Sequence, residues 1–177
     1  MGRRRCPYDG EGRGFVERVQ SVKLKKIIEN FDLEVLKGPE GYEDRLITTD
    51  DVNRPGLQLT GFFDYFDDER MQLIGLVETS YLERLEPQQR LSSFDALFAY
   101  DFPALIFSRG LEPFPECMQM ADKHNKIILR TQDTTSNFMS TLIAYLKQAL
   151  SPCITRHGVL LDIYGEGVLI LGESGVG

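Results

Sequence analysis

The chain has 177 residues, which is enough for one domain of ordinary size, or for one domain and the start of another. Its 42% hydrophobic and 27% charged residues are typical of a soluble globular protein, and no apolar stretch approaches the roughly 20 residues of a membrane span. A formal net charge of −7 argues against nucleic acid or an anionic membrane as the main partner. Three scattered cysteines without a C-x-x-C pair indicate reduced thiols in the cytoplasm, rather than a disulfide framework or a zinc site.

Residues 1–20 are predicted to form a flexible basic arm. They contain four glycines and five arginines, and almost no periodic apolar pattern. A disordered extension or a start-site artefact is the preferred interpretation, and a phosphate-binding arm is the alternative.

Ordered structure is predicted to begin at Ser21, which can cap a short helix. The segment that follows is broken by glycine, proline and other turn residues into short pieces. The expected elements are a helix over 22–31 and strands at 33–36, 46–48 and 57–61, the last of them after a turn-rich segment over 50–56.

Strands and helices then alternate, which is the pattern of parallel βαβ units. The expected elements are a strand at 72–77, a helix behind Pro87, a strand at 104–107, a helix at 115–124, a strand at 127–129 and a helix at 134–147. The predicted fold class is therefore α/β, with a mixed, largely parallel sheet and flanking helices. Because the last helix meets Pro152, the predicted division is an arm over 1–20, an α/β domain over 21–149 and a new domain that starts within 150–177.

Two apolar runs at the C-terminal end predict a β-hairpin. Residues 158–164 and 168–171 are strand-like, and Gly165-Glu166-Gly167 separates them as a three-residue turn. If Tyr164 pairs with Val168, the register places His157 opposite Gly175.

The last six residues resemble the beginning of a phosphate-binding loop, G-x-x-x-x-G-K-[ST], and follow a strand as that motif requires. Glycines there let backbone N–H groups approach phosphate oxygens. The lysine and the Ser/Thr of the motif are not among the 177 residues. The predicted nucleotide-binding residues are Gly172, Glu173, Ser174, Gly175, Val176 and Gly177. His157 is the candidate catalytic residue, and a turn histidine with a structural hydrogen bond is the alternative.

Other polar groups are weaker candidates. His124 lies in a polar run that is typical of a solvated helix end. The segment 54–56 (Arg-Pro-Gly) could bind an anion, although a structural turn is preferred. The acidic residues Asp64, Asp67, Asp68 and Glu69 lack the spacing of a calcium loop and are interpreted as a charged turn, so no metal ligand is predicted in this chain.

Residues 156–177 (RHGVLLDIYGEGVLILGESGVG) closely resemble the start of the catalytic domain of bacterial HPr kinase/phosphorylases. Residues 54–61 (RPGLQLTG) and 72–75 (QLIG) are similar to the N-terminal domain of that family. The resemblance covers about residues 21–177. It implies an N-terminal domain similar to that of a cell-wall ligase of the MurF type, followed by the hairpin and the first part of the phosphate loop.

The resemblance also implies an activity. Such enzymes phosphorylate a seryl residue of HPr, the phosphocarrier of the sugar phosphotransferase system, with ATP or pyrophosphate, and remove the phosphate with inorganic phosphate. They use Mg²⁺, are hexameric and control carbon catabolite repression. His157 matches the active-site histidine and 172–177 match the first part of the ATP-binding loop.

Because the loop lysine is absent from these 177 residues, we expect them alone to be inactive and to hold no cofactor. An alternative hypothesis is a ligand-sensing or assembly module attached to another phosphate-loop NTPase.

Overall fold

The computed structural model describes residues 20–151 and 158–171. These residues belong to two separate compact units, an α/β domain up to Ser151 and a β-hairpin after it. Among the described residues, no helix is both long and apolar enough to cross a membrane.

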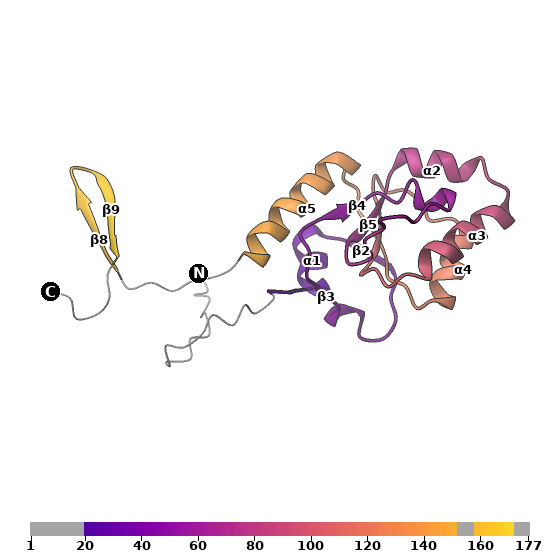
Figure 1. Cartoon of the computed structure of the whole chain (residues 1–177), viewed down its shortest axis with the longest axis horizontal. Helices are drawn as coiled ribbons and strands as arrows, with labels where there is room; N and C mark the ends of the chain where they lie inside the picture. The colour runs from indigo at the N-terminus through magenta and orange to yellow at the C-terminus, as the bar shows by residue number, and fades with distance from the viewer. Residues whose placement is uncertain (1–19, 152–157, 172–177) are drawn as a thin grey trace. The chain divides into compact units, whose positions relative to one another are not determined.

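A five-stranded sheet forms the centre of the α/β domain, with the strand order β2-β7-β6-β5-β4 (Figure 1). Strands β4 to β7 run parallel to one another, and β2 is antiparallel to β7. The predicted mixed, largely parallel sheet is therefore confirmed. The strands are β2 (Glu34–Lys37), β4 (Val52–Asn53), β5 (Met71–Ile74), β6 (Leu105–Phe107) and β7 (Ile128–Arg130).

Helices cover both faces of this sheet (Figure 1). Helices α1 (Leu24–Phe31) and α5 (Thr135–Leu150) pack on one face, next to the small pair of strands β1 (Val22–Lys23) and β3 (Leu46–Ile47). The other face carries α2 (Leu76–Glu83), α3 (Pro87–Phe98), α4 (Pro115–Lys123) and the 3₁₀ turn η2 (Gln58–Thr60). A second 3₁₀ turn, η1 (Tyr42–Asp44), contacts α1.

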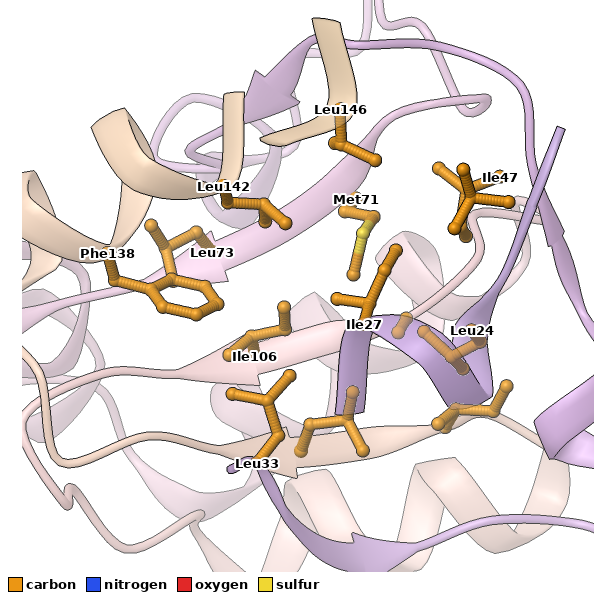
Figure 2. Packing of buried hydrophobic residues seen from close by; sticks show 14 residues of the cluster. Leu24, Ile27, Leu33, Ile47, Met71, Leu73, Ile106, Phe138, Leu142 and Leu146 are labelled. Carbon is orange, nitrogen blue, oxygen red and sulfur yellow. The ribbon is translucent and has the colours of Figure 1, made fainter. Parts of the chain in front are cut away.

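Alternate side chains of the strands enter two separate hydrophobic clusters, because successive residues of a strand point to opposite faces. Leu73, Ile106 and Leu129 pack with α1 and α5, whereas Ile74, Leu105 and Ile128 pack with α2, α3 and α4. Both faces of the sheet are therefore buried, as expected for parallel strands. Figure 2 shows the first cluster, with Leu24, Ile27, Leu33, Ile47, Met71, Leu73, Ile106, Phe138, Leu142 and Leu146.

Two helices begin where the sequence predicts them because proline occupies their first position. Pro87 opens α3 and Pro115 opens α4. At this position the missing N–H costs nothing, and the fixed φ angle suits a helix. The predicted helix over 134–147 is also present, and extends to Leu150.

Three expectations were wrong between residues 22 and 77. Val22 and Lys23 form a strand before the helix, and residues 57–61 form the turn η2 instead of a strand. The expected strand at 72–77 ends at Ile74, and α2 follows at once. Leu76 and Val77, the first two residues of α2, are apolar but exposed. The apolar residues of α2 therefore do not gather on its buried face, and the sequence shows no helical apolar pattern there.

Gly75 makes the sharp passage from β5 to α2 possible. It is buried against α5, and a Cβ atom at this position would lie 2.5 Å from Thr135 Oγ1. The absence of a side chain therefore lets the start of α5 approach the end of β5.

The hairpin consists of β8 (Gly158–Ile163) and β9 (Glu166–Leu171). Ile163 pairs with Glu166, so the turn has two residues, Tyr164 and Gly165. Both have positive φ angles, 56° and 85°, which is the geometry of a type I′ turn, and Gly165 N donates to Asp162 Oδ1 at 2.8 Å. The predicted three-residue turn and its register were therefore wrong. His157 and Gly175, which that register placed opposite each other, lie outside the described residues.

Cys117 is expected to be chemically inert in the folded protein. Cys117 is a residue of α4, and its side chain is fully buried in the hydrophobic cluster on that face of the sheet. This burial raises the pKa of its thiol. Because the thiolate is the reactive form, alkylation of Cys117 at pH 8 should be at least roughly tenfold slower in the native protein than in urea. Mass spectrometry of the peptide that contains Cys117 measures both rates. Equal rates in the two states would contradict the buried position.

Candidate functional site

Parallel strands β4 to β7 end at one edge of the sheet, where open α/β folds usually bind ligands. The residues that directly follow strands β4, β5, β6 and β7 are Arg54, Gly75, Ser108 and Thr131. Helices α2 and α5 also begin at this edge. It is therefore the first place in the domain to examine for binding groups.

Arg54 and Glu78 form the charged part of this edge. The Glu78 side chain is only 5% exposed, and its Oε2 accepts hydrogen bonds from Arg54 Nη2 and Gly75 N, both at 2.9 Å. The carboxylate thus satisfies the first backbone N–H of the α2 turn and neutralises the arginine. Of the two interpretations of residues 54–56, the structure supports the structural turn.

Ser108 and Thr135 close the edge between β5, β6 and α5. Ser108 Oγ donates to Ile74 O at 3.1 Å, so Thr135 Oγ1, 2.7 Å away, is the donor to Ser108 Oγ. Both residues are buried. The polar groups at this part of the edge therefore satisfy one another and hold α5 against the end of β5.

Backbone hydrogen bonds close the next part of the edge. Arg109 N donates to Asp133 O, and Gly110 N donates to Thr131 O, both at 2.8 Å. These bonds join the loop after β6 to the loop after β7. The donors named here for the carboxyl edge are therefore engaged within the domain.

Residues Asp64, Asp67, Asp68 and Glu69 lie in a charged turn, as interpreted from the sequence. Asp67 Oδ2 accepts a hydrogen bond from Arg70 Nε at 2.8 Å. Within residues 20–151 and 158–171, no group of three His, Cys, Asp or Glu side chains could hold a metal ion.

His124 has a more definite role than a solvated helix end. It follows α4, and its Nε2 lies 2.6 Å from Asp95 Oδ1 on α3. Lys123 Nζ donates to the same oxygen at 2.7 Å. The two bonds tie the end of α4 to the middle of α3, and they hold the pKa of the Asp95 carboxyl below its ordinary value, with the His124 bond as the largest cause.

We expect Asp95→Asn to lower the free energy of unfolding at neutral pH. In acid, the variant and the wild type should become more nearly equal in stability. A carboxyl whose pKa is lower in the folded state contributes stability above its ordinary pKa of about 3.9. That contribution disappears as the pH falls through the folded-state pKa. Urea unfolding at pH 7 and pH 3 measures the free energy of unfolding of both proteins. The difference between Asp95→Asn and the wild type should be larger at pH 7 than at pH 3. The matched control is Glu29→Gln, an exposed carboxylate on α1, and a constant difference at both pH values would refute the ion-pair explanation.

Lys126 is a buried cation at the opposite, amino-terminal edge of the sheet. Its residue is 8% exposed, its Nζ donates to Tyr100 O, and the ammonium lies 5.0 Å from the centre of the Phe102 ring. Burial lowers the pKa of Lys126. Because Tyr100 closely follows α3, the ammonium is placed where the carbonyl groups of a helix end attract a cation. Its contacts therefore explain Lys126 as a structural cap.

The hairpin is the other element that bears on a site. Strand β9 continues to Leu171, directly before the glycine-rich segment, so a strand does precede the expected phosphate loop. His157 and residues 172–177 lie outside the described residues, and their predicted roles remain predictions.

Comparison with known proteins identifies the family. Residues 22–146 match the family described as "HPr Serine kinase N terminus". The HPr kinase/phosphorylase of Caldicellulosiruptor bescii is 47% identical over 152 residues, which are 86% of this chain and 49% of that protein. Those of Alkaliphilus metalliredigens (47% over 159 residues; 90% and 51%) and Lachnoclostridium phytofermentans (45% over 157 residues; 89% and 51%) are similar.

A solved structure is also similar, the CBS and DRTGG domains of the regulatory region of Clostridium perfringens pyrophosphatase. The TM-score is 0.49 at 18% identity, over 72% of this chain and 47% of that chain. This chain spans about half the length of the curated relatives it matches. The family resemblance that its motifs carry is confirmed, and the chain belongs to the HPr kinase/phosphorylase family, whose N-terminal region it contains.

Proposed function

We propose that the whole protein is a bifunctional enzyme that phosphorylates a seryl residue of the phosphocarrier HPr, with ATP or pyrophosphate as donor. With inorganic phosphate it removes the same phosphate and releases pyrophosphate. The observation that carries this proposal is the 43–47% identity to HPr kinase/phosphorylases over 86–90% of the chain. The cellular role would be control of carbon catabolite repression in the cytoplasm.

The hairpin would lead the chain into the nucleotide site. In this proposal, residues 172–177 approach the phosphates of the donor with backbone N–H groups, as glycine-rich loops do. His157 would orient or stabilise a phosphate beside the loop. These roles rest on the match of the two motifs, RHG at 156–158 and GESGVG at 172–177, to the family pattern.

Magnesium is implied by the family resemblance, and when bound it would neutralise charge that develops on the transferred phosphate. The described residues do not make a metal site. The contribution proposed for this chain is therefore the phosphate loop backbone and His157, together with a separately folded N-terminal domain similar in kind to that of a MurF-type ligase.

The test is a phosphotransfer assay with the full-length protein and purified HPr. ATP or pyrophosphate should place one phosphate on a seryl group of HPr, and added inorganic phosphate should remove it as pyrophosphate. One-way transfer would indicate a plain kinase, and no transfer with either donor would refute the proposal. A polypeptide of only these 177 residues should give no turnover, because the loop lysine is not among them.

His157→Ala in the full-length protein should lower kcat for both directions by roughly two orders of magnitude, as the loss of a group that stabilises transferring phosphate does. Binding of HPr should be unchanged. His124→Ala is the matched control, because His124 contacts Asp95 within the α/β domain. Equal activities of the two variants would show that His157 is not part of the active site.

A further inference from the structure

A cavity of about 350 Å³ lies at the amino-terminal edge of the sheet, opposite the carboxyl edge. We call it the amino-edge cavity. Residues of three segments line it: 39–45 around η1, 101–103 before β6, and 125–127 before β7. Small-molecule sites in proteins have volumes of about 300–1,000 Å³. Three parts of the chain that are distant in sequence thus surround a space large enough for a small ligand.

Lys126 brings a buried positive charge to the amino-edge cavity. The residue is 8% exposed, and its Nζ donates to Tyr100 O. Asp101 Oδ1 lies 3.7 Å from Nζ, which is beyond the usual length of a hydrogen bond. An ammonium group has three N–H donors, and the bond to Tyr100 uses one of them. Lys126 can therefore donate to a ligand in the cavity and keep its structural contact.

Arg45 and Asp101 join two of the three segments. Arg45 Nη2 donates to Asp101 O at 2.8 Å and lies 2.9 Å from Asp101 Oδ2. This pairing holds the guanidinium in place beside the cavity. The Asp101 side chain is 76% exposed, and a carboxylate can accept several hydrogen bonds at once. The pair thus offers the cavity both a donor and an acceptor.

Tyr42 supplies an aromatic ring to the same cavity. The ring packs against the cluster beneath α1 and α5, and a Cβ atom at Gly38 would lie only 2.7 Å from Tyr42 Cδ1. The absence of a side chain at Gly38 therefore lets the ring approach the backbone closely and fixes its position. Asn125 adds a side-chain amide, which can both donate and accept.

The charges around the amino-edge cavity disfavour an ionic ligand. The carboxylates Glu40, Asp44 and Asp101 outnumber the cations Arg45 and Lys126, so an anion would be repelled. A cation would in turn meet the buried ammonium of Lys126. A hydroxyl group, in contrast, is uncharged and both donates and accepts, which matches a mixture of donors and acceptors. The carbon frame of a polyhydroxyl compound can also pack against an aromatic ring.

From this chemistry we infer that the amino-edge cavity binds a small, uncharged polyhydroxyl compound of about the size of a monosaccharide. Arg45 and Lys126 donate to its hydroxyl groups, Asp101 accepts from them, and Tyr42 contacts its carbon frame. The site lies entirely within the α/β domain and uses none of the residues proposed for phosphotransfer. Either proposal can therefore fail without the other.

An NMR titration of the isotope-labelled 177-residue chain tests the inference. D-glucose, D-fructose and myo-inositol are added separately, up to millimolar concentrations. At least one of them should shift the amide signals of Gly41, Asn125 and Ile127 in a saturable way, and leave that of Ser140 on α5 unchanged. The monophosphate esters of the two sugars should bind at least roughly tenfold more weakly, because their charge meets three carboxylates. No shift with any of the three compounds would overturn the inference, as would tighter binding of the esters.

Two variants supply the sharper test. Asp101→Asn should raise the dissociation constant of the compound that binds roughly tenfold, because a charged acceptor is lost, whereas it would tighten the binding of an anion. Asn125→Gly should raise it roughly fivefold, and glycine readily adopts the positive φ angle of 53° found at this position. Glu29→Gln on α1 is the matched control and should leave the affinity unchanged.

The two variants also protect the test against a folding defect. Circular dichroism melts show whether Asp101→Asn, which loses part of its pairing with Arg45, still folds. If it does not, the result for Asn125→Gly decides. Tighter binding by Asp101→Asn would overturn the inference, as would an unchanged affinity of Asn125→Gly.

Discussion

Replacing Phe138 by alanine should lower the free energy of unfolding by about 3–5 kcal/mol. The Phe138 side chain is completely buried between α5 and the sheet (Figure 2). Its ring lies edge-to-face with that of Phe31, with the ring centres 5.6 Å apart. Alanine would leave a cavity that touches both α1 and the strands. Urea unfolding, followed by circular dichroism, measures the change.

The control for this substitution lies on the same helix. Ser140 is exposed on α5, and its Oγ only donates to Asn137 O one turn earlier. Ser140→Ala should change the stability by less than about 0.5 kcal/mol. If Phe138→Ala lowers the free energy of unfolding by less than about 1 kcal/mol, the cavity collapses in the variant, and α5 is not tightly packed against the sheet.

Replacing Arg90 by methionine should cost about 2–4 kcal/mol, because it leaves a largely buried carboxylate without its partner. Arg90 Nη2 pairs with Glu116 at 3.0 Å, and the two side chains are only 15% and 14% exposed. Arg90 Nη1 also donates to Leu85 O at 2.7 Å, just after α2. One guanidinium thus joins α2, α3 and α4.

A double-mutant cycle separates the ion pair from the other contacts of Arg90. The double variant Arg90→Met, Glu116→Gln should be more stable than the sum of the single losses predicts, since neither charge is then left alone. Glu116→Gln alone should cost less than Arg90→Met, because Arg90 keeps its backbone acceptors. Additive losses would show that Arg90 acts through α2 and the Phe114 ring, 5.1 Å away, rather than through Glu116.

The regular part of the fold is well predicted from the sequence because its signals are local. Proline opens α3 and α4, and short apolar runs mark β6 and β7. The α2 helix escapes prediction because Leu76 and Val77, its first two residues, prolong the apolar run of β5, so the sequence there is read as one strand. Its cap is the Glu78 carboxylate on Gly75 N, and its first two apolar residues face outward. Neither feature produces a helical apolar period.

Some features of the candidate site are likewise predicted from the sequence, and others are not. The strand before the glycine-rich segment is predicted correctly, since it is a plain apolar run. The turn of the hairpin is not, because Tyr164 adopts a positive φ angle, which the sequence suggests only for glycine. Glu78, Ser108 and Thr135, which organise the carboxyl edge, were also missed. They are separated along the chain, and single polar residues carry no spacing signal.

The antiparallel pairing of β2 with β7 has a consequence for biosynthesis. Glu34 and Arg130 are 96 residues apart, and Arg130 Nε donates to Glu34 Oε2 at 2.9 Å. At roughly 5–20 residues per second, the ribosome needs about 5–20 s to make the partner of β2 after β2 itself. During this interval β2 is an unpaired strand edge, open to contact with other nascent chains. Slower translation of the codons between β2 and β7 is therefore expected to increase aggregation.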